Sequence, residues 1–182
     1  MNETLRVIAD RYSCRDFKPD RLPDEALRAI ALAAVQSPSG MNNQPWRAIV
    51  VRDQRLMDEF EAEGMRILKA MDDQSAYNRI MGRGGRIFYG APAMVVVPIQ
   101  PGAELDCGIV CQSIALAAAS LSIGSVICGM ASLPLSGGRG AEFIARLGFP
   151  EGYVFGCSVL LGYANTKKPP HEPDESKISF IG

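Results

Sequence analysis

Histidine is almost absent from this chain of 182 residues: the one histidine, His171, lies in a proline-rich segment. A Ser-His-Asp triad needs a histidine fixed beside its nucleophile, and so does a Cys-His dyad. A metal site built from several histidines is excluded outright. No side chain therefore stands out as a catalytic group, and any reaction is expected to take its reactive group from a cofactor.

The chain also lacks an excess of charge of either sign. It has 19 Lys and Arg against 20 Asp and Glu, a formal net charge of −1, so nothing draws it to nucleic acid or to an anionic membrane. The uncharged stretch 107–138 is longer than the roughly 20 apolar residues that span a bilayer. Serine, glutamine, proline and glycine interrupt it, and many of its apolar residues are alanine. We therefore predict a helix buried within the protein and no membrane span.

Cysteine does not occur in a number or spacing that suggests disulfides. The five cysteines are Cys14, Cys107, Cys111, Cys128 and Cys157, which favours free thiols in a reducing cytoplasm. The first residues show no basic segment followed by an apolar run, so no secretory signal is expected. Cys107 and Cys111 stand one helical turn apart with no second pair, so we expect buried thiols and no metal. The role of Cys128 depends on what lies beside residues 127–130.

Length and apolar spacing predict one α+β domain, residues 1–182, with a C-terminal arm over residues 164–182. Helices are expected at residues 3–10, 23–35, 56–71, 77–81, 106–121 and 141–147, the fifth capped by Asp106. Strands are expected at residues 47–52, 94–99 and 153–163, with a short strand or extended loop at residues 125–130 and a short edge strand near Ile178 and Phe180. The arm is too polar to fold on itself, and the surface that its apolar tip needs could belong to a partner chain.

Arg11, Ser13 and Arg15 place two guanidinium groups and a hydroxyl within five residues. A phosphate monoester carries nearly two negative charges near neutral pH, and arginine binds it through strong charge-assisted bonds. Lys167 and Lys168, after the last long strand, could complete the same pocket. In the simpler alternative, Arg11 complements the end of the first helix and the other cations are solvated. Taken alone, these residues favour that alternative.

Residues 38–46, Pro-Ser-Gly-Met-Asn-Asn-Gln-Pro-Trp, form a tight polar turn between a helix and a strand. Gly40 and the two prolines shape its backbone, while Ser39, Asn42 and Gln44 supply polar groups around one small space. An amide side chain can donate or accept along the pyrimidine edge of a flavin ring. With the cations upstream, the turn suggests a flat heteroaromatic ligand that ends in a phosphate, such as flavin mononucleotide (FMN). A plain polar helix-to-strand loop is an equally good alternative.

Five motifs, in order, resemble those of the FMN-dependent nitroreductase family. They are Arg-x-Ser-x-Arg-x-Phe from residue 11, Pro-Ser-Gly-x-Asn-x-Gln-Pro-Trp from residue 38, Gly-Ala-Pro at residues 90–92, Leu-Gly-Phe-Pro-Glu-Gly at residues 147–152, and Leu-Gly-Tyr with a following Lys-Pro at residues 161–169. The resemblance extends over residues 5–169. Each motif alone is weak, and five in the same order and spacing are strong.

The resemblance implies an α+β sandwich, with a mainly antiparallel central sheet flanked by helices, built as an intertwined homodimer with the C-terminal arm exchanged. It also implies two FMN sites at the subunit interface. By matching positions, the residues that would bind FMN are Arg11, Tyr12, Ser13, Arg15, Pro38, Ser39, Asn42, Gln44, Ile127, Cys128, Gly129, Lys167 and Lys168. Residues 11–15 and a lysine would hold the phosphate and ribityl end. Asn42, with Gln44 as nearby support, would reach the flavin ring, and Pro38 and Ser39 would do so from the partner. Residues 127–129 would run along the ring near its N5 atom.

Two departures from the family pattern bear on these expectations. Many members have Lys-Pro-Arg in the tail, whereas Lys168 is followed by two prolines, so Arg15 is expected to supply more of the charge. Some members place a Pro-x-Glu-Gly segment beside N5, and the matching residues 127–130 lack the glutamate. Substrate preferences of the glutamate-bearing members therefore do not transfer.

The activity that the resemblance implies is that of a cytoplasmic oxidoreductase. Hydride would pass from NAD(P)H through FMN to a small acceptor such as a nitroaromatic or a quinone. The chemistry would take place on the flavin, so no catalytic side chain and no metal is assigned. One open alternative is a carrier, sensor or electron-transfer module that holds FMN without its own NAD(P)H turnover. Another is a specialised member that performs reductive dehalogenation, enoate reduction or flavin breakdown.

Overall fold

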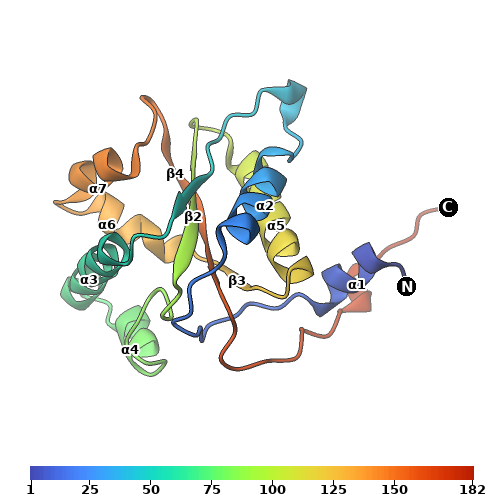
Figure 1. The fold of residues 1–182 in the computed structure, drawn as a ribbon, viewed down its shortest axis with the longest axis horizontal. Helices are drawn as coiled ribbons and strands as arrows, with labels where there is room; N and C mark the ends of the chain where they lie inside the picture. Colours follow the sequence, from blue (N-terminus) through green and yellow to red (C-terminus); the bar gives the residue numbers. More distant parts are fainter.

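The computed structural model describes residues 1–182 and contains a four-stranded sheet between two layers of helices (Figure 1). The strands are β1 (Ile49–Val51), β2 (Ala93–Ile99), β3 (Gly124–Ile127) and β4 (Val154–Gly162), in the spatial order β1-β2-β4-β3. Each neighbouring pair is antiparallel. The predicted α+β sandwich with an antiparallel sheet is thus confirmed.

Seven α-helices surround the sheet. They are α1 (Glu3–Asp10), α2 (Asp24–Val35), α3 (Gln54–Ala70), α4 (Ser75–Met81), α5 (Glu104–Ser120), α6 (Ser132–Ser136) and α7 (Gly140–Leu147). Single 3-10 turns lie at Gly40–Asn42, Gly129–Ala131 and Glu175–Lys177. In Figure 1, α2 and α5 lie on one side of the sheet, and α3, α6 and α7 on the other. The sequence pattern does not predict α6, because five residues are too few to show a helical period.

The central strand β2 separates two hydrophobic cores. It is buried along its whole length, and successive side chains point to opposite faces of the sheet. Val95 and Val97 belong to the core that includes residues of α2 and α5, whereas Met94 and Val96 belong to the core that includes residues of α3 and α7. Since helices seal both faces, a large ligand has access to the sheet only at its edges.

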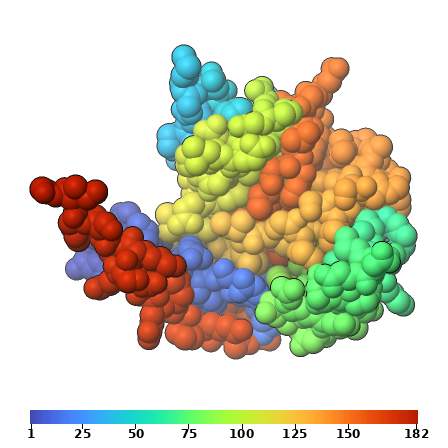
Figure 2. All heavy atoms as spheres, turned by 180° about the vertical axis from the view of Figure 1, so that it is seen from behind, coloured from blue at the N-terminus to red at the C-terminus, as the bar shows by residue number.

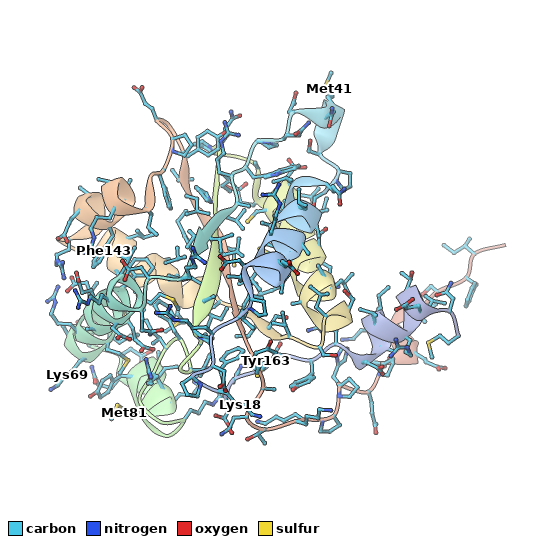
Figure 3. The ribbon with its side chains drawn as sticks, viewed as in Figure 1. Lys18, Met41, Lys69, Met81, Phe143 and Tyr163 are labelled. Carbon is cyan, nitrogen blue, oxygen red and sulfur yellow. The ribbon has the colours of Figure 1, made fainter.

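α5 begins at Glu104, two residues before the predicted start, so Asp106 lies in its first turn and is not the N-cap. The Asp106 carboxylate instead accepts a hydrogen bond from the backbone N–H of Gly40 at 3.3 Å. This contact ties the 38–46 turn to α5, and Figure 3 shows Met41 at the tip of that turn. No helix in the structure is long and apolar enough to cross a membrane.

The C-terminal arm, residues 164–182, projects beyond the body of the molecule (Figure 2). It contains no strand, and Phe180 is 96% exposed, so the predicted edge strand near Ile178 and Phe180 is wrong for the single chain. Alternation of apolar and polar residues supplies a strand's side-chain pattern but not the neighbouring strand that its backbone must pair with. The apolar tip of the arm has nothing to cover it within its own chain.

Candidate functional site

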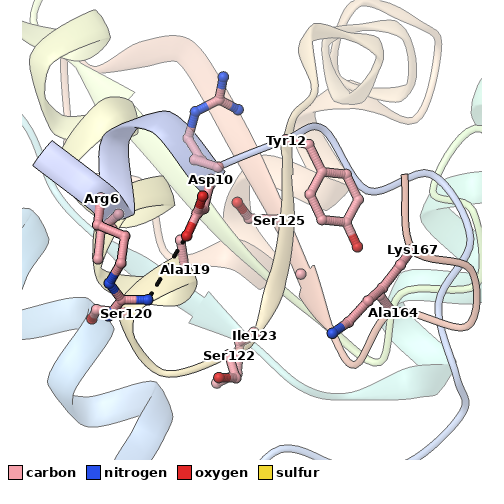
Figure 4. Close-up of a pocket in the computed structure, with 13 residues that line it drawn as sticks. Arg6, Asp10, Tyr12, Ala119, Ser120, Ser122, Ile123, Ser125, Ala164 and Lys167 are labelled. Atoms are coloured by element: carbon pink, nitrogen blue, oxygen red, sulfur yellow. Dashed lines mark ion pairs between the residues drawn. The ribbon is translucent and has the colours of Figure 1, made fainter. Parts of the chain in front are cut away.

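A hollow of about 350 Å³ lies between α1, the end of α5 and the start of β3 (Figure 4). It is lined by Arg6, Val7, Asp10, Arg11, Tyr12, Ala119, Ser120, Ser122, Ile123, Gly124, Ser125, Ala164 and Lys167. Three of these residues are cationic and one is a carboxylate, so the wall has a net charge of +2. The C-terminal ends of α1 and α5 open on the hollow with partial negative charge. The binding of an anion in this hollow therefore depends on the three cationic side chains.

Arg11 and Tyr12 line the hollow because the two residues that follow them pair with the start of β3. The backbone N–H of Cys14 donates to the Ser125 carbonyl at 2.9 Å, and Ser13 forms a parallel bridge with Ser125. The Cys14 side chain is buried in the core, which anchors the segment, while Arg11 and Ser13 stay partly exposed. Arg15 is exposed and lies outside the wall of the hollow.

Asp16 brings the start of the arm to the same place. The Asn165 amide nitrogen donates to the Asp16 carboxylate at 3.2 Å, and the Thr166 hydroxyl also donates to it. These bonds position the backbone so that Lys167 lines the hollow. In Figure 4 the Lys167 side chain extends along the wall, with Tyr12 on the same side. Lys168 is exposed and does not line the hollow. Of the cations predicted at the phosphate end, Arg11 and Lys167 thus come together.

Five polar residues of the wall were not among the predicted site residues: Arg6, Asp10, Ser120, Ser122 and Ser125. Arg6 pairs with Asp10 at 3.8 Å (Figure 4), which offsets part of its charge. Ser122 has a left-handed backbone, with φ of 59°, because the chain turns sharply there between α5 and β3. No local pattern marks these residues, since only the packing of α1 beside α5 and β3 brings them together.

β3 leads from the hollow to the predicted segment 127–129. At about 3.3 Å per residue, Ser125 to Gly129 spans roughly 13 Å of extended chain. The Ile127 side chain is 46% exposed, and nothing lies within 4 Å of a Cβ built on Gly129. Beyond the bridge between Ser13 and Ser125, the outer edge of the sheet is therefore open at Ile127 and Gly129.

Cys128 points the other way, into the core. Its thiol lies 3.8 Å from the Ile87 carbonyl, and burial raises the pKa of this thiol to about 11. The thiol therefore stays protonated near neutral pH. The Cys128 side chain belongs to the core, so only the backbone of this residue can face a ligand at the sheet edge that continues from β3.

The 38–44 turn lies on another side of the molecule, away from α1 and its hollow (Figures 1 and 3). The Gln44 N–H donates to the Ser39 hydroxyl at 2.8 Å, and the Gln44 amide donates to Asn42 Oδ1 at 3.1 Å. Met41, Asn42 and Gln44 all have positive φ, between 48° and 57°. Such backbone costs free energy in residues other than glycine and is concentrated at binding sites. Within one chain, this ordered and exposed turn does not meet the cationic hollow.

The chain matches a family model over most of its length. Residues 8–163 match the model described as "Nitroreductase family". The chain belongs to the nitroreductase family. It is 64% identical to a nitroreductase with bound FMN from Desulfitobacterium hafniense DCB-2, with a TM-score of 0.98 and 100% of each chain covered. A nitroreductase with bound FMN from Bacteroides fragilis NCTC 9343 is 25% identical, with a TM-score of 0.91 and 100% of each chain covered.

A curated relative adds the name of an electron donor. The Archaeoglobus fulgidus protein named "Putative NADH dehydrogenase/NAD(P)H nitroreductase" is 32% identical over 183 residues, which cover 96% of this chain and 93% of the relative. The resemblance stated from the five sequence motifs is therefore confirmed, both as a family and as a nitroreductase-like fold.

The donors around the hollow fit a phosphate monoester. Arg11 and Lys167 supply positive charge, and Tyr12 and Ser125 supply hydroxyl groups at the same wall. Burial raises the pKa of Tyr12, so its phenol keeps its proton near neutral pH and can donate a hydrogen bond. A phosphate monoester has three acceptor oxygens, and this hollow offers them both cationic and neutral hydrogen-bond donors.

Proposed function

We propose that this protein is an FMN-dependent oxidoreductase that passes hydride from NAD(P)H to a small acceptor such as a nitroaromatic or a quinone. The observation that carries the proposal is the cationic hollow at the edge of β3, continued by an open sheet edge at Ile127 and Gly129. FMN has a phosphate at one end and a flat ring at the other, in the same order. The FMN of the Desulfitobacterium relative and the name of the Archaeoglobus relative support the cofactor and the donor.

The protein's part would be to bind and to orient. Arg11 and Lys167 would hold the phosphate, Tyr12 would donate to it, and Ser13, which lies outside the wall of the hollow, would donate to the ribityl chain. Arg15 and Lys168 lie outside the wall of the hollow, and we assign them to its rim. Bound FMN supplies the hydride-accepting group, so no side chain of this chain has to act as nucleophile or general acid. The backbone of residues 127–129 would present an edge along which the ring lies.

We propose further that residues 1–182 form one domain and that a second copy completes its site. The 38–44 turn cannot reach its own hollow, so Pro38, Ser39, Asn42 and Gln44 would approach the ring from the partner subunit. Hydrogen bonds join Ser39, Gln44 and Asn42 into one turn. Asn42 and Ser39 would therefore come from the same subunit, which revises the expected division of this turn between two subunits.

The opposite edge of the sheet offers a surface for the partner's arm. Two adjoining hollows of about 450 and 320 Å³ lie where α2 meets the edge strand β1. Their walls contain Arg21, Arg28 and Arg52 against one carboxylate, together with apolar side chains. The arm is acidic over residues 172–175 and apolar over residues 178–181. Charge and apolar surface therefore match, and we propose that the arms of two copies are exchanged here.

Removal of residues 172–182 should turn the dimer into a monomer while leaving Lys167 and Lys168 in place. The truncation removes the exposed apolar tip of the arm, which in this proposal holds the two copies together. Light scattering after gel filtration measures the mass in solution. Lys177→Ala, an exposed change within the same arm, should keep the dimer. A truncated protein that stays dimeric would contradict the exchange.

Asn42→Gly should weaken the binding of FMN and of riboflavin alike, by on the order of tenfold, because one or two hydrogen bonds to the ring are lost. Glycine is the suitable replacement since Asn42 has φ of 57°, where alanine would be strained. The change should leave the dimer intact. Asn43→Gly is the matched control, because the Asn43 side chain makes no hydrogen bond within the chain. Unchanged affinity in Asn42→Gly would remove this turn from the site.

A visible absorption spectrum of the purified protein tests the cofactor. We expect flavin bands that persist through gel filtration and FMN that is released on denaturation. Steady consumption of NADH or NADPH with a nitroaromatic or a quinone then tests the activity. Retained FMN without turnover would favour a carrier or electron-transfer module. A colourless protein that takes up no added FMN would overturn both.

A further inference from the structure

Three cysteine side chains meet between α5 and β4. Cys107 and Cys111 lie one turn apart on the face of α5 that packs against the sheet, and both are buried. Cys157 lies on β4 and packs against the same core, to which Val159 also belongs. The Cys107 sulfur is 2.7 Å from the place that a Cβ on Gly156 would occupy, so helix and strand are in close contact here. All three cysteines are free thiols.

The three thiols are not equivalent. The pKa of Cys111 is raised by both of the other thiols, whereas the pKa values of Cys107 and Cys157 are each lowered mainly by Cys111. The interaction with Cys111 lowers the pKa of Cys157 to about 7, while the neighbouring thiols and burial raise the pKa of Cys111. Cys157 is also partly exposed, and Cys111 is only 1% exposed. Cys157 is therefore the thiol that ionises and meets a solute first.

We propose that Cys157 and Cys111 are a redox-active pair that hydrogen peroxide converts into a disulfide. The Cys157 thiolate attacks one peroxide oxygen, the O–O bond breaks, and hydroxide leaves and takes up a proton to give water. Cys157 is then a sulfenic acid. The Cys111 thiol loses its proton, and its sulfur attacks the Cys157 sulfur; the S–O bond breaks, and the departing hydroxide becomes a second water. Two thiols lose two electrons, and one peroxide is reduced to two waters.

Cys157 lies close in the fold to the segment 127–129. The register of β3 and β4 pairs Ile127 with Val159, and the Cys128 N–H donates to the Ser158 carbonyl at 2.7 Å. Cys157 directly precedes Ser158 in β4. A bridge from Cys157 to α5 would thus begin one residue away from the contact between β4 and Cys128. The inference itself rests on the thiols and holds whether or not FMN binds there.

The experiment is a thiol count on the whole protein, reduced, freed of reductant and treated with one hydrogen peroxide per chain at pH 8. The number of thiols that react after denaturation should fall from five to three, and dithiothreitol should restore it. Cys157→Ser and Cys111→Ser should each abolish the disulfide. Cys107→Ser, the matched control in the same cluster, should still lose two thiols, and a peptide map without reductant should show Cys111 linked to Cys157.

The pH dependence adds a readout that a buried structural cysteine would not give. The rate of thiol loss should rise about tenfold between pH 6 and pH 8, as Cys157 ionises. Circular dichroism establishes that each variant is folded. Three results would each overturn the proposal: five thiols that survive peroxide, loss that persists unchanged in Cys157→Ser, or a bridge that requires Cys107.

Discussion

Arg11→Ala should weaken FMN binding by between about tenfold and a hundredfold and leave riboflavin binding nearly unchanged. Arg11 lines the cationic hollow, where it and Lys167 face the position proposed for the phosphate. A hydrogen bond to a charged group contributes about 1.5–3 kcal/mol, which corresponds to that range of affinity. Riboflavin carries the same ring and ribityl chain without the phosphate, so it makes no use of this cation. Fluorescence titration of the apoprotein with each flavin gives the two dissociation constants.

The control is an exposed cation close by in the chain. Lys18 does not line the hollow, and its backbone N–H, which donates to the Tyr163 carbonyl at 2.8 Å, survives a change of side chain. Lys18→Ala should therefore bind FMN as the unchanged protein does. Equal losses for FMN and riboflavin in Arg11→Ala, or a loss no greater than in Lys18→Ala, would show that the hollow does not hold the phosphate.

Most of the fold could be predicted because its signals are local. The apolar period of α3 and the continuous apolar run of β2 place both elements within two residues of where they lie. Asp106 shows the limit: it is a good cap residue, yet the helix starts earlier and its carboxylate binds Gly40 instead. The arm shows another limit, since a strand near Ile178 depends on a neighbour that the single chain does not contain.

The candidate site was predictable only where chemistry is concentrated in short segments. Two arginines and a hydroxyl in five residues predict a phosphate end, and in the structure one of these residues, Arg11, lies in the same hollow as Lys167. Ser122 and Ser125 carry no such signal, because the packing of α1 and α5 places them. The direction of Cys128 could have been derived, since period-two alternation sets it on the same face as the buried Val126. No pattern in the sequence tells that the 38–44 turn lies away from the hollow of its own chain.

Gly140→Ala should destabilise the folded protein by about 3 kcal/mol, at the upper end of what overpacking usually costs. A Cβ on Gly140 would lie 2.0 Å from the Leu135 carbonyl oxygen and 2.8 Å from the carbonyl carbon. Both are backbone atoms, which cannot rotate aside as a side chain would. The Gly140 N–H also donates to the Gly137 carbonyl at 2.9 Å, so the corner between α6 and α7 cannot easily widen. Denaturant unfolding followed by circular dichroism measures the loss.

Gly138→Ala is the matched control two residues away, because nothing lies within 4 Å of a Cβ at that position. Alanine restricts the unfolded chain in the same way at both positions, so that contribution cancels in the comparison. The difference between the two variants therefore isolates the contact with Leu135. α7 lies on the α3 side of the sheet, away from the cationic hollow, so Gly140→Ala protein that remains folded should bind FMN normally. Equal stability of the two variants would mean that the α6–α7 corner opens at little cost.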